Sequence, residues 1–154
     1  MSVRLEEITI DNYRVVLMLK VAEDQQKFVA TNCCSVAQSK FYPSYRPRAI
    51  YTGEEPVGFL MYGHENEGDP SVITISRLMI AEAHQRKGYG REALRLAVDE
   101  IRNDLAPNRV LICYELENEI AKRVYAEFGF VEIGHDEDGE VIAELRDGSG
   151  AVGG

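Results

Sequence analysis

The chain has 154 residues, enough for one domain with one hydrophobic core. It carries 17 Lys and Arg against 26 Asp and Glu, which gives a formal net charge of −9. This charge argues against non-specific binding to nucleic-acid phosphates and favours cationic partners. The alternative is that the acidic residues only keep the protein soluble. We predict one domain over residues 1–146, followed by a flexible glycine-rich tail at 147–154.

The sequence favours a cytoplasmic protein without membrane spans. Its three cysteines, Cys33, Cys34 and Cys113, form neither a disulfide framework nor a C-x-x-C pair, so we expect reduced thiols. No segment approaches the run of about 18 apolar residues that a membrane helix needs. The histidines lack metal-ligand spacing, so no metal site is predicted.

Apolar periodicity and turn residues predict the elements in chain order. They are a strand at 3–9, a helix capped by Asp11, a less regular helical region at 26–42, a hairpin at 48–65, a strand at 72–80, a helix from about 88 to 103, a strand at 108–117, a helix capped by Asn118 and two strands around Asp138-Gly139. This order predicts a mixed α/β sheet with helices on both faces.

The strand at 72–80 changes its phase of alternation. Ile73 and Ile75 share one parity, whereas Leu78 and Ile80 share the other. One inserted residue would bring both pairs to the same face, so we predict a β-bulge near Ser76–Leu78. A strand buried on both faces is the alternative.

The run "HQRKGYG" before the helix at 88 favours an anion site. Gly88 and Gly90 permit positive φ and close approach, so the backbone N–H groups of residues 86–91 can converge at the positive end of the helix. Full positive charges come from Arg86, Lys87 and Arg91. An ordinary tight turn that caps a helix is the alternative.

Two motifs carry a family resemblance. The first is Gln85-x-x-Gly88-x-Gly90 between the strand "ISRLMI" and an amphipathic helix, and the second is "NEIAKRVYAEFGF" at 118–130. Together they cover about 72–131 and resemble the Gcn5-related N-acetyltransferase (GNAT) superfamily. Within it, "EPVGFLMYG" and "RVYAEFGF" are most similar to bacterial spermine/spermidine acetyltransferases.

The resemblance implies a fold, a cosubstrate and a binding site. The implied fold is a mixed sheet of about six or seven strands flanked by about four helices, whose bulged, splayed strand forms a cleft for acetyl-CoA. Cofactor contacts are implied for Leu78, Met79, Ile80, Gln85, Arg86, Lys87, Gly88, Tyr89, Gly90, Arg91, Asn118 and Tyr125. A homodimer is a further expectation from resemblance.

The resemblance also implies direct acetyl transfer to an amine, with Tyr125 as general acid. Without it, Tyr125 reads as a core tyrosine and Asn118 as a helix cap. Relatives often place a carboxylate on the bulged strand, where this chain has Thr74 and Ser76. Glu115 is the candidate base, acting through a water, or else an outward charge.

Three functions remain open at this point. The preferred one is acetylation of a small primary amine, with a polyamine such as spermidine or spermine as acceptor. The second keeps the enzyme but changes the acceptor to a protein N-terminus, lysine, amino acid or aminoglycoside. The third is a non-catalytic CoA-binding module. Glu54, Glu55, Glu65 and Glu67 near the hairpin are candidates to bind the ammonium in place of the missing strand carboxylate, although the sequence does not place them. The acidic run "HDEDGE" is interpreted as a solvated turn.

Overall fold

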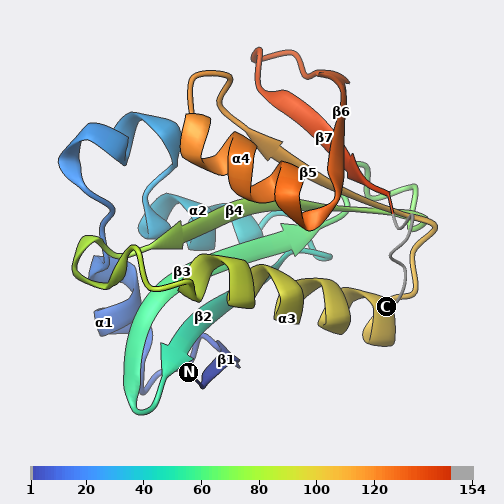
Figure 1. The fold of residues 1–154 in the computed structure, drawn as a ribbon. Helices are drawn as coiled ribbons and strands as arrows, with labels where there is room; N and C mark the ends of the chain where they lie inside the picture. Colours follow the sequence, from blue (N-terminus) through green and yellow to red (C-terminus); the bar gives the residue numbers. More distant parts are fainter. Residues whose placement is uncertain (1, 147–154) are drawn as a thin grey trace.

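The computed structural model describes residues 2–146, and all seven of their strands join one sheet in the order β1-β2-β3-β4-β5-β7-β6 (Figure 1). The strands are β1 (Val3–Glu7), β2 (Arg46–Thr52), β3 (Glu55–Gly63), β4 (Val72–Ile80), β5 (Arg109–Tyr114), β6 (Phe130–His135) and β7 (Val141–Leu145). The helices are α1 (Tyr13–Met18), α2 (Asn32–Ser39), α3 (Tyr89–Asp104) and α4 (Glu119–Phe128), with 3-10 turns η1 (Glu23–Phe28) and η2 (Glu82–His84). The tail predicted for 147–154 lies outside the described residues.

Helices cover both faces of the sheet, as the element order predicted. Helices α3 and α4 lie on one face, where the predicted stripe of α3 is buried at Leu94, Ala97, Val98 and Ile101. Helices α1 and α2 lie over the other face, on a smaller core that includes Phe59 and Met61 (Figure 1). Between Ser2 and Arg146, no helix is both long and apolar enough to cross a membrane.

The first helix begins differently from the prediction. Asn12, not Asp11, precedes α1, and the Asn12 side chain accepts a hydrogen bond from the backbone N–H of Thr9 at 2.7 Å instead of capping the helix. The helical region predicted at 26–42 is split into η1 and α2. Thr31 accounts for the break, because its hydroxyl accepts from Cys34 N and starts a new helix.

The predicted bulge is confirmed at Ser76. In the antiparallel pairing of β3 with β4, Met61 lies opposite Arg77 and Tyr62 lies opposite Ile75, which leaves Ser76 as the extra residue. The bulge therefore shifts the alternation of β4 by one position.

This shift places both apolar pairs of β4 on one side. Ile73 and Ile75 are buried in the core below α3, and Leu78 and Ile80 pack against the same core. Arg77 instead reaches toward α2 on the opposite face.

Strands β4 and β5 diverge beyond the bulge. They are the one parallel pair of the described sheet, and their pairing ends at Ile75 with Ile112. Beyond that point, β4 continues along β3 to Ile80, whereas β5 continues along β7 to Tyr114. The divergence opens the middle of the sheet at the carboxyl ends of these two strands.

Candidate active site

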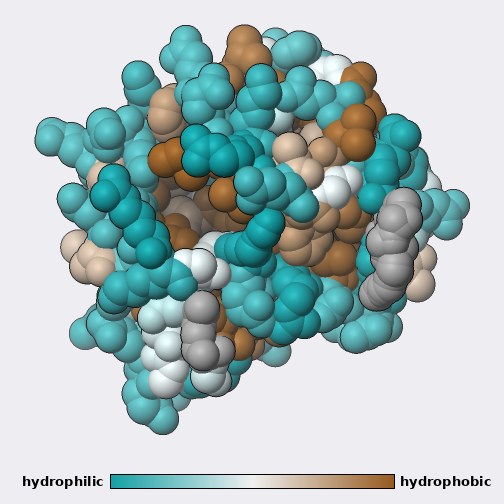
Figure 2. Space-filling model, in the orientation of Figure 1, coloured by the Kyte–Doolittle hydropathy of each residue, from teal (hydrophilic) through white to brown (hydrophobic). Residues whose placement is uncertain are grey.

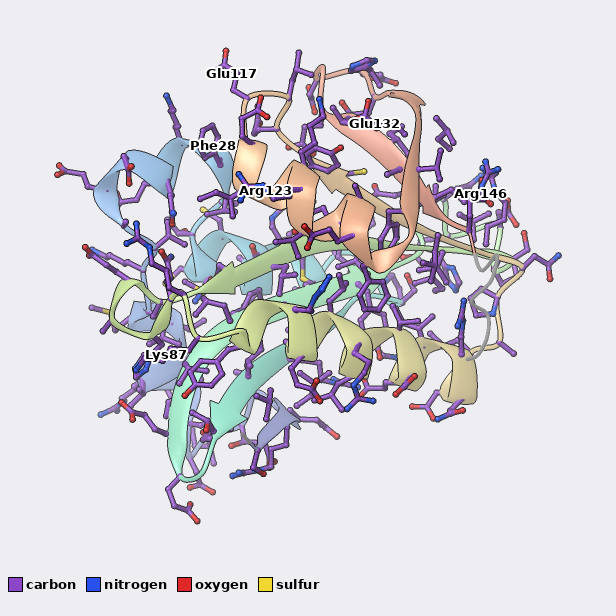
Figure 3. All side chains as sticks on the ribbon, in the orientation of Figure 1. Phe28, Lys87, Glu117, Arg123, Glu132 and Arg146 are labelled. Atoms are coloured by element: carbon purple, nitrogen blue, oxygen red, sulfur yellow. The ribbon has the colours of Figure 1, made fainter. Side chains whose placement is uncertain are left out.

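A cleft of about 310 Å³ lies where β4 and β5 diverge. We call it the cleft; it is lined by Lys27, Phe28, Val29, Ala30, Ser76, Arg77, Leu78, Cys113, Tyr114, Glu115, Asn118, Tyr125 and Glu140. In Figure 2, apolar surface is recessed between hydrophilic side chains in the region between η1 and α4. Phe28, the last residue of η1, lies beside the start of α4 (Figure 3).

A second pocket of about 460 Å³, here the acidic pocket, lies on the α2 face of the sheet. Its charged lining residues are Glu65, Asp69, Arg77, Asp136, Asp138 and Glu140. Four residues line both cavities, namely Ser76, Arg77, Cys113 and Glu140. We call these four residues the junction, because a molecule in the cleft and a molecule in the acidic pocket would meet there.

Tyr125 reaches the cleft from the buried face of α4. Its ring centroid lies 5.5 Å from that of Tyr114 and 6.2 Å from that of Phe130, both in edge-to-face geometry, so the ring is held by aromatic packing. Burial raises the pKa of Tyr125, and the neighbouring Tyr114 raises it further. The side chain is thus a fixed, neutral phenol that can donate a proton into the cleft.

Asn118 caps α4 and also lines the cleft. Its Oδ1 accepts a hydrogen bond from Ala121 N at 3.1 Å, which caps α4. The same side chain lines the cleft, where its amide NH₂ group remains available as a donor.

The glycine turn has one of the two predicted positive-φ glycines. Gly88 adopts a φ of 83° and precedes α3, whereas Gly90 lies inside the helix without positive φ. A Cβ at Gly90 would lie 3.6 Å from Ile80 Cγ1, which is an ordinary contact within the protein. Within the same turn, Arg86 also has a positive φ, of 67°.

The start of α3 leaves backbone donors free. Its first hydrogen bond runs from Glu92 N to Gly88 O, so the N–H groups of Tyr89, Gly90 and Arg91 precede the helical ladder. Arg86 and Lys87 are exposed, and Lys87 lies beside the beginning of α3 in Figure 3.

Two side chains tie this turn to its surroundings. Gln85 Nε2 donates to Ile80 O and to Gln25 Oε1, each at 2.8 Å, and so joins the turn to β4 and to η1. Arg91 pairs with Glu127 of α4 at 3.2 Å. Gln85 is therefore a clamp on the turn, a role the sequence did not indicate.

The end of β4 presents an unpaired edge. Leu78, Met79 and Ile80 pair with β3 on one side, but β5 has already diverged on the other. Leu78 lines the cleft, and Met79 is buried against α1 and α2. Backbone groups on the free edge can receive an extended ligand as an added strand.

The acidic run "HDEDGE" lines the pockets and is not merely a solvated turn. Asp136 Oδ1 accepts from the N–H groups of Asp138 and Glu140, both at 2.9 Å, which folds the β6–β7 connection tightly. Because Val141 pairs with Tyr114, Glu140 lies beside the end of β5. The sequence signalled the turn, but only this strand pairing brings Glu140 to the junction.

Glu140 and Cys113 are electrostatically unusual. Burial raises the pKa of Glu140, the Asp136 and Glu115 carboxylates raise it further, and Arg77 lowers it. Burial also raises the pKa of the Cys113 thiol to about 12. Ligand-type atoms of Cys113, Asp136 and Glu140 all lie within 4.8 Å of one another.

The remaining predicted carboxylates separate into two groups. Glu115 lines the cleft and Glu65 lines the acidic pocket. Glu55 contacts His84 at 3.2 Å, Glu67 bonds Ser44, and Glu54 is exposed in the β2–β3 turn. None of these last three lines either pocket, so Glu65 is the one of the four candidates near the hairpin that does.

Comparison with known proteins agrees with this geometry. A family model described as the acetyltransferase (GNAT) family matches residues 4–130. The spermine/spermidine N(1)-acetyltransferase of Bacillus subtilis (strain 168) is 26% identical over 134 residues, covering 84% of this chain and 88% of the relative.

Solved structures confirm the predicted fold. The aminoglycoside acetyltransferase AAC(6')-Ib in complex with coenzyme A and kanamycin superimposes with a TM-score of 0.75 at 21% identity, covering 94% of each chain. The spermidine N-acetyltransferase from Vibrio cholerae in complex with CoA and spermine gives a TM-score of 0.71 at 17% identity, covering 92% of each chain.

Proposed function

The chain belongs to the GNAT family of acetyltransferases, and from this premise we propose that it transfers an acetyl group from acetyl-CoA to a primary amine of a polyamine such as spermidine or spermine. The observation that carries the proposal is the junction, where the cleft and the acidic pocket meet beside Glu140. The cleft would hold the acyl donor and the acidic pocket the amine. One acetyltransferase domain over residues 1–146 is part of the proposal.

Acetyl-CoA fits the residues around the cleft. The free N–H groups at the start of α3 suit the pyrophosphate, with Arg86 and Lys87 beside them as exposed cations. The free edge at Leu78–Ile80 suits the amide-bearing pantetheine arm. When bound, this cosubstrate supplies an acetyl group activated as a thioester.

The acidic pocket suits a polycation. Alkyl ammonium groups have a pKa near 10.4 and are charged at neutral pH, so the carboxylates at the wide part of the pocket would hold the amines that do not react. One terminal amine would then lie at the junction.

Glu140 is proposed as the proton acceptor. It lines both cavities, and its raised pKa brings its basicity closer to that needed near neutral pH. Glu115, the base expected from the sequence, contributes to the raised pKa of Glu140 and lines the cleft, so we assign it a shared role in passing the proton on.

Tyr125 is proposed as the proton donor to the departing thiolate. Its phenol is buried and neutral, and it lines the cleft. The amine nitrogen forms the new bond to the acetyl carbon, the carbon–sulfur bond breaks, and one proton goes to Glu140 while another comes from Tyr125. No covalent intermediate on the protein is needed.

An amine panel tests the function. The protein is incubated with acetyl-CoA and spermidine, spermine, kanamycin, lysine or a peptide with a free N-terminus, and released CoA thiol is measured. We expect turnover with the two polyamines. Turnover only with kanamycin or only with the peptide would move the acceptor to that class, and tight acetyl-CoA binding without turnover on any amine would leave a binding module.

Compartment and assembly complete the proposal. We propose a cytoplasmic enzyme because Cys33, Cys34 and Cys113 are all free thiols. A homodimer is proposed from the family resemblance.

A further inference from the structure

Arg77 is the one cationic side chain among the described residues that line the acidic pocket. It also lines the cleft, so it belongs to the junction where the reacting amine would lie. The bulge at Ser76 explains its direction, because the shifted alternation sends Arg77 toward α2 and away from the α3 core.

Neutral oxygen atoms hold the guanidinium in place. Its Nε donates to Ser35 Oγ at 3.2 Å, Nη1 donates to Ser76 O at 2.7 Å and Nη2 donates to Gln38 Oε1 at 3.3 Å. Within residues 2–146, Arg77 forms no ion pair within 4.0 Å. Its positive charge is therefore fixed at the junction without a directly bonded counter-charge.

A wholly acidic pocket would oppose the reaction. Carboxylates attract an ammonium group but also raise its pKa, and only the neutral amine has the lone pair that attacks a carbonyl. At the end of the pocket where transfer occurs, some group must therefore lower the pKa of the bound ammonium. A nearby fixed cation lowers it, because like charge disfavours the ammonium form.

We propose that Arg77 is a positioning residue that keeps the reacting amine of the acceptor neutral at the junction, while the carboxylates of the wider pocket hold the amines that stay charged. The inference rests on the proposed acetyl transfer and adds the device that selects the protonation state. The proton lost by the bound ammonium passes through Glu140 to solvent before the attack, so that the carboxylate is ionised again when it accepts the second proton as the amide forms. Arg77 favours that ionised form because it lowers the pKa of Glu140.

Several titratable groups line the cleft or the acidic pocket around the junction. They are Glu65 and Asp69 from the β3–β4 connection, Cys113 and Glu115 from β5 and the residue after it, Asp136, Asp138 and Glu140 from the β6–β7 connection, Tyr45 before β2, and Lys27 from η1. The carboxylates outnumber the cations, so removal of Arg77 leaves a field that favours ammonium throughout.

The pH dependence of kcat at saturating spermidine tests the role, because kcat reports groups in the bound complex. For Arg77→Gln we expect the acidic limb to move up by about one pH unit, a fall in kcat of about tenfold at pH 7, and convergence with the parent protein at high pH. Arg77→Lys keeps the charge and should keep the limb near its original position. Arg95→Gln removes an exposed arginine on α3 and should leave the profile unchanged.

A weakly basic acceptor separates this role from effects on folding or on Glu140. We would use a spermidine analogue whose terminal amine has a pKa below about 7 because of fluorine on the adjacent carbon. Its amine is already neutral at pH 7, so Arg77→Gln should then have the parent kcat. A loss that persists with this analogue, an unshifted limb, or the same shift in Ser35→Ala, which keeps the charge, would overturn the proposal. Failure of the parent protein to acetylate any amine would instead refute the proposed function.

Discussion

The packing of Tyr125 suits the role of proton donor that we propose for it. Its ring is fixed between Tyr114 and Phe130, and burial raises the pKa of its hydroxyl, so the phenol keeps its proton across the physiological pH range. A core tyrosine and a proton donor need the same aromatic packing. The two interpretations differ only in whether the hydroxyl donates a proton to a ligand in the cleft.

Tyr125→Phe removes the hydroxyl and keeps the ring. We expect kcat for spermidine to fall on the order of 100-fold, because the leaving thiolate loses its proton donor. The KM for acetyl-CoA should change little, since the packing of α4 is preserved. Steady-state kinetics measure both values, and Tyr51→Phe on β2 is the control. An unchanged kcat would show that Tyr125 is a core residue only.

Glu140→Gln should separate activity from stability. The pKa of Glu140 is raised in the folded state, so its ionised form is less favoured there than in the unfolded chain, and it lowers stability as pH rises through the folded pKa. The variant should therefore lose kcat on the order of 100-fold, yet unfold at a slightly higher temperature at pH 7. This gain should vanish below the unfolded pKa of about 4.3. Kinetics and thermal denaturation at both pH values check the pair; a lowered melting temperature at pH 7 with unchanged kcat would contradict it.

At the scale of elements, the bulged strand and the turn that follows it create the site together. The bulge decides which face each side chain takes, so Leu78 packs on the α3 side and Arg77 points toward α2, and the divergence of β5 frees one edge of β4. Gln85 then fixes the turn to Ile80, so the start of α3 keeps a constant position relative to that edge.

Gly88→Ala tests the turn. An L-residue at a φ of 83° is strained, so we expect a loss of about 1 kcal/mol in the free energy of unfolding. The displaced N–H groups should raise the KM for acetyl-CoA several-fold while kcat stays within about twofold. Gly53 has a φ of 60° in the β2–β3 turn and lies outside the pockets, so it provides a matched control. The Gly53→Ala variant should lose stability without a change in the KM for acetyl-CoA. Equal KM values for the two variants would argue against a cofactor role for the Gly88 turn.

Sequence periodicity predicted these elements where the signal is local. The phase change in β4 and the apolar stripe of α3 each lie within one element, and both agree with the structure. Element ends were less well determined: β5 ends at Tyr114, three residues before its predicted limit of 117, because its pairing with β7 stops there.

At the scale of the whole molecule, the site depends on contacts between segments distant in sequence. Arg77 is anchored by Ser35 and Gln38, about forty positions earlier in the chain. Glu140 reaches the junction because β7 is inserted between β5 and β6. Local patterns hold no information on these pairings, so the sequence named the residues that we propose for the cofactor but missed Glu140 and Arg77, which we propose for the acceptor.

The charge of the whole molecule predicts the effect of salt. With a net charge of −9 and several carboxylates around the acidic pocket, attraction of a polycation should weaken as the Debye length shortens from about 14 Å to about 4 Å between roughly 0.05 M and 0.5 M salt. We expect the KM for spermine to rise about tenfold over this range, with kcat nearly constant. Glu65→Gln should reduce this dependence because Glu65 lines the pocket, whereas Glu54→Gln, which changes the same charge in the exposed β2–β3 turn, should have a smaller effect. Kinetics at several salt concentrations, with a monoamine acceptor for comparison, would measure these slopes. Equal slopes for the two variants would mean that the overall charge attracts the acceptor and the pocket itself adds nothing.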